Sequence, residues 1–279
     1  MTPPLTGDAL ARICEQTEAS HLAEQVHAFA RLRPVADARV LPFAGGIAVL
    51  SAPEFGHKLN RVTGAALDGP LDAAAIAALE RSFEARATGL EIDLCPYADP
   101  GAWPVLAARG YTVESFTNTY AIELATLPDA PATAPDLEIA ALDRGDAETF
   151  VAAAVAAFSA RPSPRSPALL ETLARIALLR PRTELFVARS AGTIAATAAL
   201  ALLETSEGTV AHLFLASTLP AARNRGVQRA LLSHRLRRAR ALGARFATVA
   251  ARPATTSARN TERAGLRLVY NKPTLRRPA

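Results

Sequence analysis

The sequence contains only two cysteines, Cys14 and Cys95, and they lie far apart. Their spacing matches neither a zinc-binding motif nor the paired-cysteine framework of a small secreted domain. We therefore expect no structural metal ion and no disulfide. Both residues are expected to be small apolar side chains in the interior.

Long apolar segments are missing as well. No internal run is long and uncharged enough to span a bilayer, and the start of the chain has no basic segment followed by an apolar one. These features favour a soluble, cytoplasmic protein without a membrane partner.

Aromatic residues are scarce, at 5% of the chain, whereas arginine is concentrated between Arg223 and Arg245. The formal net charge of +5 and this clustering suit an anionic ligand. Single-stranded nucleic acids usually stack on aromatic side chains, and none interrupts this basic run. A basic nucleic-acid-binding protein is therefore a third interpretation only, and we expect no nucleic-acid partner.

One segment that is present points to a specific ligand. Residues 223–230, Arg-Asn-Arg-Gly-Val-Gln-Arg-Ala, follow an apolar run from Val210 to Leu219 and open a predicted helix. The first N–H groups of a helix have no partner within it, and the helix dipole is positive there. Such a turn can bind a diphosphate. Gly226 allows the backbone to turn tightly, and arginine side chains can bind phosphate oxygens.

This segment resembles the acyl-CoA-binding motif of the GNAT N-acetyltransferase superfamily, in which Arg or Gln is followed by two residues, Gly, one residue, and Gly or Ala. Arg223 and Gly226 match the motif, whereas Gln228 replaces the second small residue and must turn its side chain outward. The resemblance implies acetyl-CoA or another acyl-CoA as co-substrate. The implied cofactor contacts are Ala216, Ser217, Thr218, Arg223, Asn224, Arg225, Gly226, Val227, Gln228, Arg229 and Asn260.

The elements expected in the second half follow the order of the GNAT fold, an α/β fold with a mixed sheet: strand, two helices, three strands, helix, strand, helix, strand. The usual final strand is not found in the sequence. The residue pattern predicts these elements at 137–142, 146–158, 167–179, 185–189, 193–203, 209–217, 226–242, 246–250, 257–264 and 266–270. A Pro-, Ala- and Thr-rich linker precedes them at 127–135.

The first half repeats part of this order at an offset of about 155 residues, so that Gly265 falls on Gly110. The phosphate-binding turn does not recur, because Asp68, Pro70 and Asp72 lie at the equivalent place and oppose phosphate binding. Asp72 is expected to cap a helix instead. We therefore predict two GNAT-like acyl-CoA N-acyltransferase domains in tandem: a degenerate domain at 1–126 and a catalytic domain at 136–279.

The resemblance also implies where the chemistry takes place. His212 is the candidate general base, on a strand face shared with Val210, Phe214 and Ala216, and an ordinary imidazole can accept a proton at physiological pH. A buried, hydrogen-bonded core histidine is the alternative. Thr261 stands where many members carry the tyrosine that protonates the leaving thiolate. Tyr270 is a candidate substitute, and a core or surface tyrosine is the alternative.

The sequence thus predicts an acyltransferase that moves an acetyl or acyl group from acetyl-CoA to a primary amine of a small molecule or peptide. A non-catalytic acyl-CoA sensor is the second interpretation, because Thr261 replaces the usual acid. We expect one acyl-CoA per chain. We also expect a monomer, with a dimer as the alternative, because a tandem repeat can cover the surface that single domains pair across.

Overall fold

The computed structural model describes residues 7–127, 137–160 and 165–277, which include one mixed sheet of eleven strands. The strands are β1 (Arg39–Phe43), β2 (Gly46–Leu50), β3 (Arg61–Thr63), β4 (Glu91–Asp93), β5 (Thr112–Glu123), β6 (Leu137–Ala141), β7 (Thr183–Ser190), β8 (Thr193–Thr205), β9 (Gly208–Thr218), β10 (Phe246–Ala251) and β11 (Arg267–Arg276). Their order across the sheet is β1-β2-β3-β4-β11-β5-β10-β9-β8-β7-β6.

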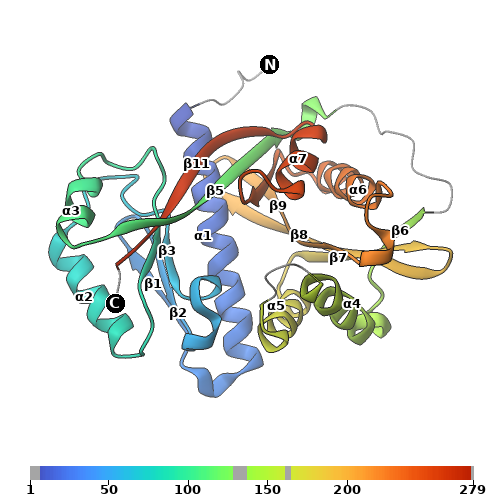
Figure 1. The fold of residues 1–279 in the computed structure, drawn as a ribbon. Helices are drawn as coiled ribbons and strands as arrows, with labels where there is room; N and C mark the ends of the chain where they lie inside the picture. The colour runs from blue at the N-terminus through green and yellow to red at the C-terminus, as the bar shows by residue number, and fades with distance from the viewer. Residues whose placement is uncertain (1–6, 128–136, 161–164, 278–279) are drawn as a thin grey trace.

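Helices cover both faces of this sheet (Figure 1). They are α1 (Gly7–Leu32), α2 (Ala73–Glu84), α3 (Ala102–Ala108), α4 (Ala147–Ser159), α5 (Pro167–Leu179), α6 (Val227–Ala241) and α7 (Thr256–Arg263). Over the second half, α6 and α7 lie on one side of the strands, and α4 and α5 lie on the other (Figure 1). Helix α1 contacts β8, β9 and β11 as well as β2 and α5, so it packs against both halves of the chain.

The fold class and the element order predicted for residues 137–270 are confirmed. The linker predicted at 127–135 lies outside the described residues from residue 128 onward, and the domain boundaries stay a prediction. One element is longer than expected: β11 was predicted to end at Tyr270 and continues to Arg276. Its second part pairs with β4 and β5, which belong to the first half of the chain.

The two halves exchange strands. Strand β5 of the first half lies between β10 and β11, with Ala121 opposite Thr248 of β10 and opposite Arg267 of β11. Strand β11 of the second half lies between β4 and β5, with Thr274 opposite Asp93 of β4. Each half thus has a strand of the other half beside its own strands. In the second half, β5 takes the place of the final strand that was not found in the sequence.

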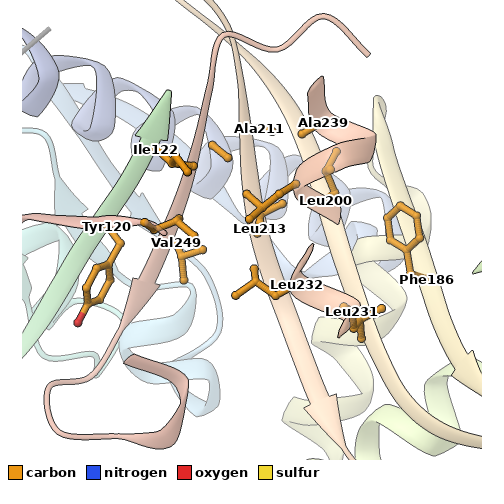
Figure 2. Packing of buried hydrophobic residues seen from close by; sticks show 14 of the residues in the cluster. Tyr120, Ile122, Phe186, Leu200, Ala211, Leu213, Leu231, Leu232, Ala239 and Val249 are labelled. Atoms are coloured by element: carbon orange, nitrogen blue, oxygen red, sulfur yellow. The ribbon is translucent and has the colours of Figure 1, made fainter. Parts of the chain in front are cut away.

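Apolar side chains of α6 fix this helix on the sheet. Leu231 and Leu232 are buried in one cluster with Leu213 of β9 and Leu200 of β8 (Figure 2). Leu236 belongs to the same cluster. Burial of each leucine contributes about 2 kcal/mol relative to exposure. The helix start is therefore held in place at the end of β9.

The equivalent helix of the first half begins differently. The carboxylate of Asp72 accepts hydrogen bonds from the backbone N–H groups of Ala74 (3.1 Å) and Ala75 (3.2 Å), which confirms it as the cap of α2. Asp68 forms an ion pair with Arg12 of α1. The first N–H groups of α2 are thus occupied by a side chain of the same chain. Across the described ranges, no helix is both long and apolar enough to cross a bilayer.

Candidate functional site

Strands β9 and β10 separate beyond a short paired segment. Their parallel pairing covers only three residue pairs, from Phe246 opposite Val210 to Thr248 opposite His212, although both strands continue. A bulge in β9 at Leu215 (φ 50°) contributes to the separation. The backbone edges of the two strands past this point form no ladder with one another, so an extended ligand can hydrogen-bond between them.

The bulge corrects one prediction about faces. Ala216 was expected on the same face as His212 and Phe214. Phe214 packs against the cluster formed with α4 and α5, whereas Ala216 packs against the cluster that contains α6. Two residues of β9 occupy the place of one at the bulge, and the alternation of side chains reverses beyond it.

The start of α6 lies next to this opening and is exposed. Gly226 is the cap residue and has a left-handed conformation (φ 76°), as does Asn224 (φ 63°). Glycine adopts this conformation without strain. Within the described part of the chain, no side chain caps α6, in contrast to Asp72 at α2. The first N–H groups of α6 are thus available to an anion.

Two of the residues predicted to contact the cofactor have side chains that are engaged within the protein. Arg223 donates hydrogen bonds to the carbonyls of Ala157 and Ala160 at the end of α4, and to the carbonyl of Thr218. The Gln228 amide donates to Thr218 Oγ1 (3.1 Å), so its side chain bends back toward the end of β9. Both contacts connect the turn to neighbouring elements and fix its shape.

The remaining predicted cofactor residues surround the same region. Asn224, Arg225 and Arg229 are exposed on the turn and the first helical turn, while Val227 is buried beneath them. Ser217 is buried, and its hydroxyl contacts Thr197 Oγ1 (2.7 Å). Thr218 is half-buried at the end of β9, and Asn260 is half-buried on α7. The structure therefore gathers the predicted residues of β9 and α6 at one end of the opening.

His212 lies at the last paired position before the strands separate, but α1 covers it. Its Nδ1 is 3.0 Å from Thr248 Oγ1, and its ring lies 4.3 Å from the His21 ring between centroids. Arg180 contacts His21 Nδ1 (2.8 Å) from the end of α5. Burial lowers the pKa of His212 to about 4; the Glu18 charge opposes this shift, and the Arg180 charge acts in the same direction as burial. The expectation of an ordinary imidazole pKa is therefore wrong, because burial disfavours the charged ring.

Tyr270 is not brought to the opening. It lies on β11, which β5 separates from β10, and its hydroxyl donates to Glu15 Oε1 of α1 (2.5 Å). Burial raises its pKa, as does the negative charge of Glu15. The second tyrosine of this region, Tyr120 on β5, donates to Glu262 Oε1 of α7 (2.8 Å).

A buried ion cluster at the centre of the molecule was missed by sequence reasoning. Lys272 of β11 contacts Glu15 Oε1 (2.7 Å) and Glu18 Oε2 (2.8 Å) of α1. Asp93 of β4 contacts Arg61 Nε (3.0 Å) and His57 Nε2 (3.0 Å). The spacing of Glu15 and Glu18 on one helix face was the available signal, but their partners come from strands far along the chain.

Both cysteines are buried, as expected, and free. They lie in one apolar cluster, and burial raises the pKa of Cys95 to about 12. Neither is a reactive thiolate. In the part of the chain that the structure describes, no group of three or more His, Cys, Asp or Glu side chains is arranged to hold a metal ion.

Comparisons with known proteins point to one family. The sequence model described as "Acetyltransferase (GNAT) family" matches residues 148–265. A GCN5-related N-acetyltransferase from Kribbella flavida has a similar structure, with 20% identity, a TM-score of 0.66, and coverage of 94% of this chain and 95% of that one. A tandem GNAT protein from the clavulanic acid biosynthesis pathway is 13% identical, with a TM-score of 0.62, and the match covers 98% of this chain and 96% of that one. A GCN5-related N-acetyltransferase from Sphaerobacter thermophilus is 17% identical, with a TM-score of 0.58, and the match covers 99% of this chain and 95% of that one. No curated protein sequence gave a match.

Proposed function

We propose that this protein transfers an acetyl or other acyl group from acyl-CoA to a primary amine, because the model of the GNAT acetyltransferase family matches residues 148–265. One observation carries the proposal: the β9–β10 opening ends beside the uncapped start of α6. The opening suits the extended pantetheine arm, and the exposed N–H groups with Arg225 and Arg229 suit the diphosphate. Val227 and Gln228 contribute backbone N–H groups.

Arg223 has a different part in this proposal. Its guanidinium is held by three carbonyl groups, so we assign it to positioning the turn against α4. Gln228 does the same through Thr218. A small residue is therefore not required at position 228, because the Gln228 side chain is directed toward β9 and away from the start of the helix.

The reaction needs a neutral amine nitrogen that attacks the thioester carbonyl carbon. The C–N bond forms, the C–S bond breaks, and the amine proton and the thiolate must be accommodated. Backbone N–H groups at Ala216 to Thr218 on the open edge of β9 would bind the carbonyl oxygen as its charge develops. His212, neutral above about pH 5 because its pKa is about 4, would accept the proton directly or through water. Coenzyme A thiolate is a tolerable leaving group, so we assign no acid to Tyr270.

A calorimetric titration of the full chain with acetyl-CoA tests this proposal. We expect one site per chain, because Asp72 occupies the start of α2. Arg225→Glu should weaken binding by at least about 100-fold, because it replaces an attractive charge by a repulsive one, and loss of one unit charge about 6 Å from another already costs about 3 kcal/mol at an effective dielectric constant near 20. The full chain is needed because a fragment from residue 137 onward lacks β5.

Arg240→Glu is the matched control, because it makes the same charge change at the far end of α6. It should bind acetyl-CoA as the wild type does. Two equivalent sites, or binding no tighter than that of a short DNA duplex, would contradict the proposal. Binding without thiol release in the presence of amines would instead indicate an acyl-CoA sensor. We expect a monomer, which the exchange of β5 and β11 within one chain supports.

A further inference from the structure

One arginine of α6 points into the core. Arg235 is 2% exposed and follows the buried Leu231 by one helical turn, on the side of α6 that packs against the sheet. The arginines after it, Arg237, Arg238 and Arg240, are half-buried or exposed. Arg235 therefore has surroundings that the arginine-rich sequence of α6 does not indicate.

The guanidinium of Arg235 joins three elements through backbone carbonyl groups. Its Nη1 donates hydrogen bonds to the carbonyls of Ala199 on β8 (2.9 Å) and Phe214 on β9 (3.5 Å). Its Nε donates to the carbonyl of Leu231 (3.4 Å), one turn earlier in α6. Across the described ranges, no carboxylate forms an ion pair with it. The side chain thus fixes α6 to two adjacent strands at one point.

These two carbonyl groups lie at the start of the β9 bulge. Ala199 and Phe214 form the last regular pair of the β8–β9 ladder before the register shift, and regular pairing resumes at Ser217. One residue of β8 therefore faces two residues of β9, including Leu215 with its left-handed conformation. A bulge disrupts the ladder locally, and the backbone groups beside it need other partners. Arg235 supplies a donor to one carbonyl on each strand.

A buried cation that is bound only by carbonyl groups is costly in a protein core. Burial lowers the pKa of the Arg235 guanidinium to about 9, so the group stays charged at neutral pH. An apolar residue at this position would extend the contacts of Leu231 and Leu232 without that cost. The hydrogen bonds at the bulge are the feature that the arginine adds.

The bulge lies between the two parts of the proposed acyl-CoA site. Beyond it, residues 216–218 of β9 form the edge of the opening at which the thioester carbonyl would bind. The diphosphate would bind at the start of α6, about two and a half helical turns before Arg235. The same helix therefore carries the diphosphate site and the side chain that holds the bulge.

We propose that Arg235 is a positioning residue for acyl transfer: by holding the bulge from α6, it fixes the open edge of β9 relative to the diphosphate site, so that the pantetheine arm can reach from one to the other. This inference rests on the proposed function, because it concerns how acyl-CoA lies in the same site. Loss of the guanidinium should weaken the contacts of the pantetheine arm and leave those of the diphosphate intact.

Two ligands separate these contributions. The nucleotide 3′-phospho-ADP has the diphosphate of acetyl-CoA but lacks the pantetheine arm. Calorimetric titration of the full chain with each ligand gives the ratio of the nucleotide Kd to the acetyl-CoA Kd, which measures the contribution of the arm. Arg235→Met should reduce this ratio by about tenfold, through weaker binding of acetyl-CoA, because loss of a hydrogen bond to a charged group changes affinity by about that factor.

Two control variants of α6 distinguish positioning from stability. Arg240→Met makes the same substitution on the exposed side of the helix and should keep the wild-type ratio. Leu236→Ala removes a buried side chain but keeps the hydrogen bonds of Arg235, so it should lower the melting temperature and also keep the ratio. A merely structural role of Arg235 would give the behaviour of Leu236→Ala.

Amide hydrogen exchange tests the contact with the bulge without any ligand. Peptides that cover residues 213–218 are compared by mass spectrometry, and exchange there should be about tenfold faster in Arg235→Met than in Leu236→Ala. Arg235→Lys has one donor nitrogen on a shorter side chain, so it should show the same changes to a smaller extent. It provides the test if the methionine variant does not fold.

An unchanged Kd ratio, or unchanged exchange at residues 213–218, in a folded Arg235 variant would overturn this inference and leave the proposed function intact. Failure of the wild type to bind acetyl-CoA would instead refute the proposed function. Hydrogen exchange would still decide, in that case, whether Arg235 holds the bulge.

Discussion

Replacement of Lys272 by methionine should reduce the free energy of unfolding by about 3–5 kcal/mol, as expected when one partner of a buried ion cluster is removed. Lys272 is 1% exposed and lies between Glu15 and Glu18. Without the ammonium group, the two carboxylates would face each other in the interior, where Arg61 is a neighbouring cation of Glu18. Urea denaturation of the full chain measures the loss.

The loss should depend on pH in a defined direction. Burial raises the pKa of Glu15 above its ordinary value even in the wild type, and the Lys272 charge opposes this rise. In the variant the pKa of Glu15 rises further. A group whose pKa is raised by folding contributes stability below its unfolded pKa and loses it as the pH rises through the folded value. The variant should therefore approach the wild type near about pH 4 and differ most above neutrality.

A second variant makes this result specific to charge. Glu15→Gln combined with Lys272→Met removes one carboxylate together with the cation, and it should recover part of the stability at neutral pH. The Tyr270 hydroxyl retains an amide oxygen as acceptor in this variant. A loss below about 1 kcal/mol for Lys272→Met, or a loss independent of pH, would contradict the role assigned to the cluster.

Replacement of His212 by alanine should lower kcat by about two to four orders of magnitude, the usual effect of removing a general base. Acetyl-CoA affinity should stay nearly unchanged, because the N–H groups at the start of α6 are not altered. The ratio of wild-type to variant rate should be constant above about pH 5, since the wild-type imidazole is neutral there, and should fall as the pH drops through about 4.

Thr248→Val provides the matched comparison, since it removes the hydroxyl at His212 Nδ1 and preserves side-chain volume. It should lower kcat less than His212→Ala does, because the base remains but its tautomer is no longer fixed. A small change in kcat together with a lower melting temperature in His212→Ala would establish a core histidine. His212 would then have no part in the mechanism, and either a neutral amine or an ordered water would take its place.

Local features of the sequence predicted much of the fold. The turn at Gly226 and the cap at Asp72 depend on residues a few positions apart, and the structure has both of them. The end of β11 was predicted too early: the strand continues through Pro273, a residue that lacks an N–H group and usually interrupts a strand. Here Pro273 lies opposite Phe116 of β5, and its carbonyl accepts a hydrogen bond from Leu94.

The surroundings of the site could not be predicted in the same way. The low pKa of His212 results from α1, which begins about 200 residues earlier in the sequence, and no local pattern around His212 indicates this cover. The contact between Lys272 and Glu15 likewise joins β11 to α1, which lie far apart in the sequence. The residues of a motif on one loop could be predicted from the sequence, whereas groups that are brought together from distant parts of the chain could not.

The exchange of β5 and β11 also has a consequence for folding during synthesis, because the strands that pair are made at very different times. Strand β5 leaves the ribosome long before either of its neighbours, since Thr112 pairs with Arg276, 164 residues later. Until then both of its edges expose unpaired backbone groups, together with Val113 and Phe116. The nascent first half therefore has an open sheet edge until the second half is made, and such an edge can pair with another copy of the chain.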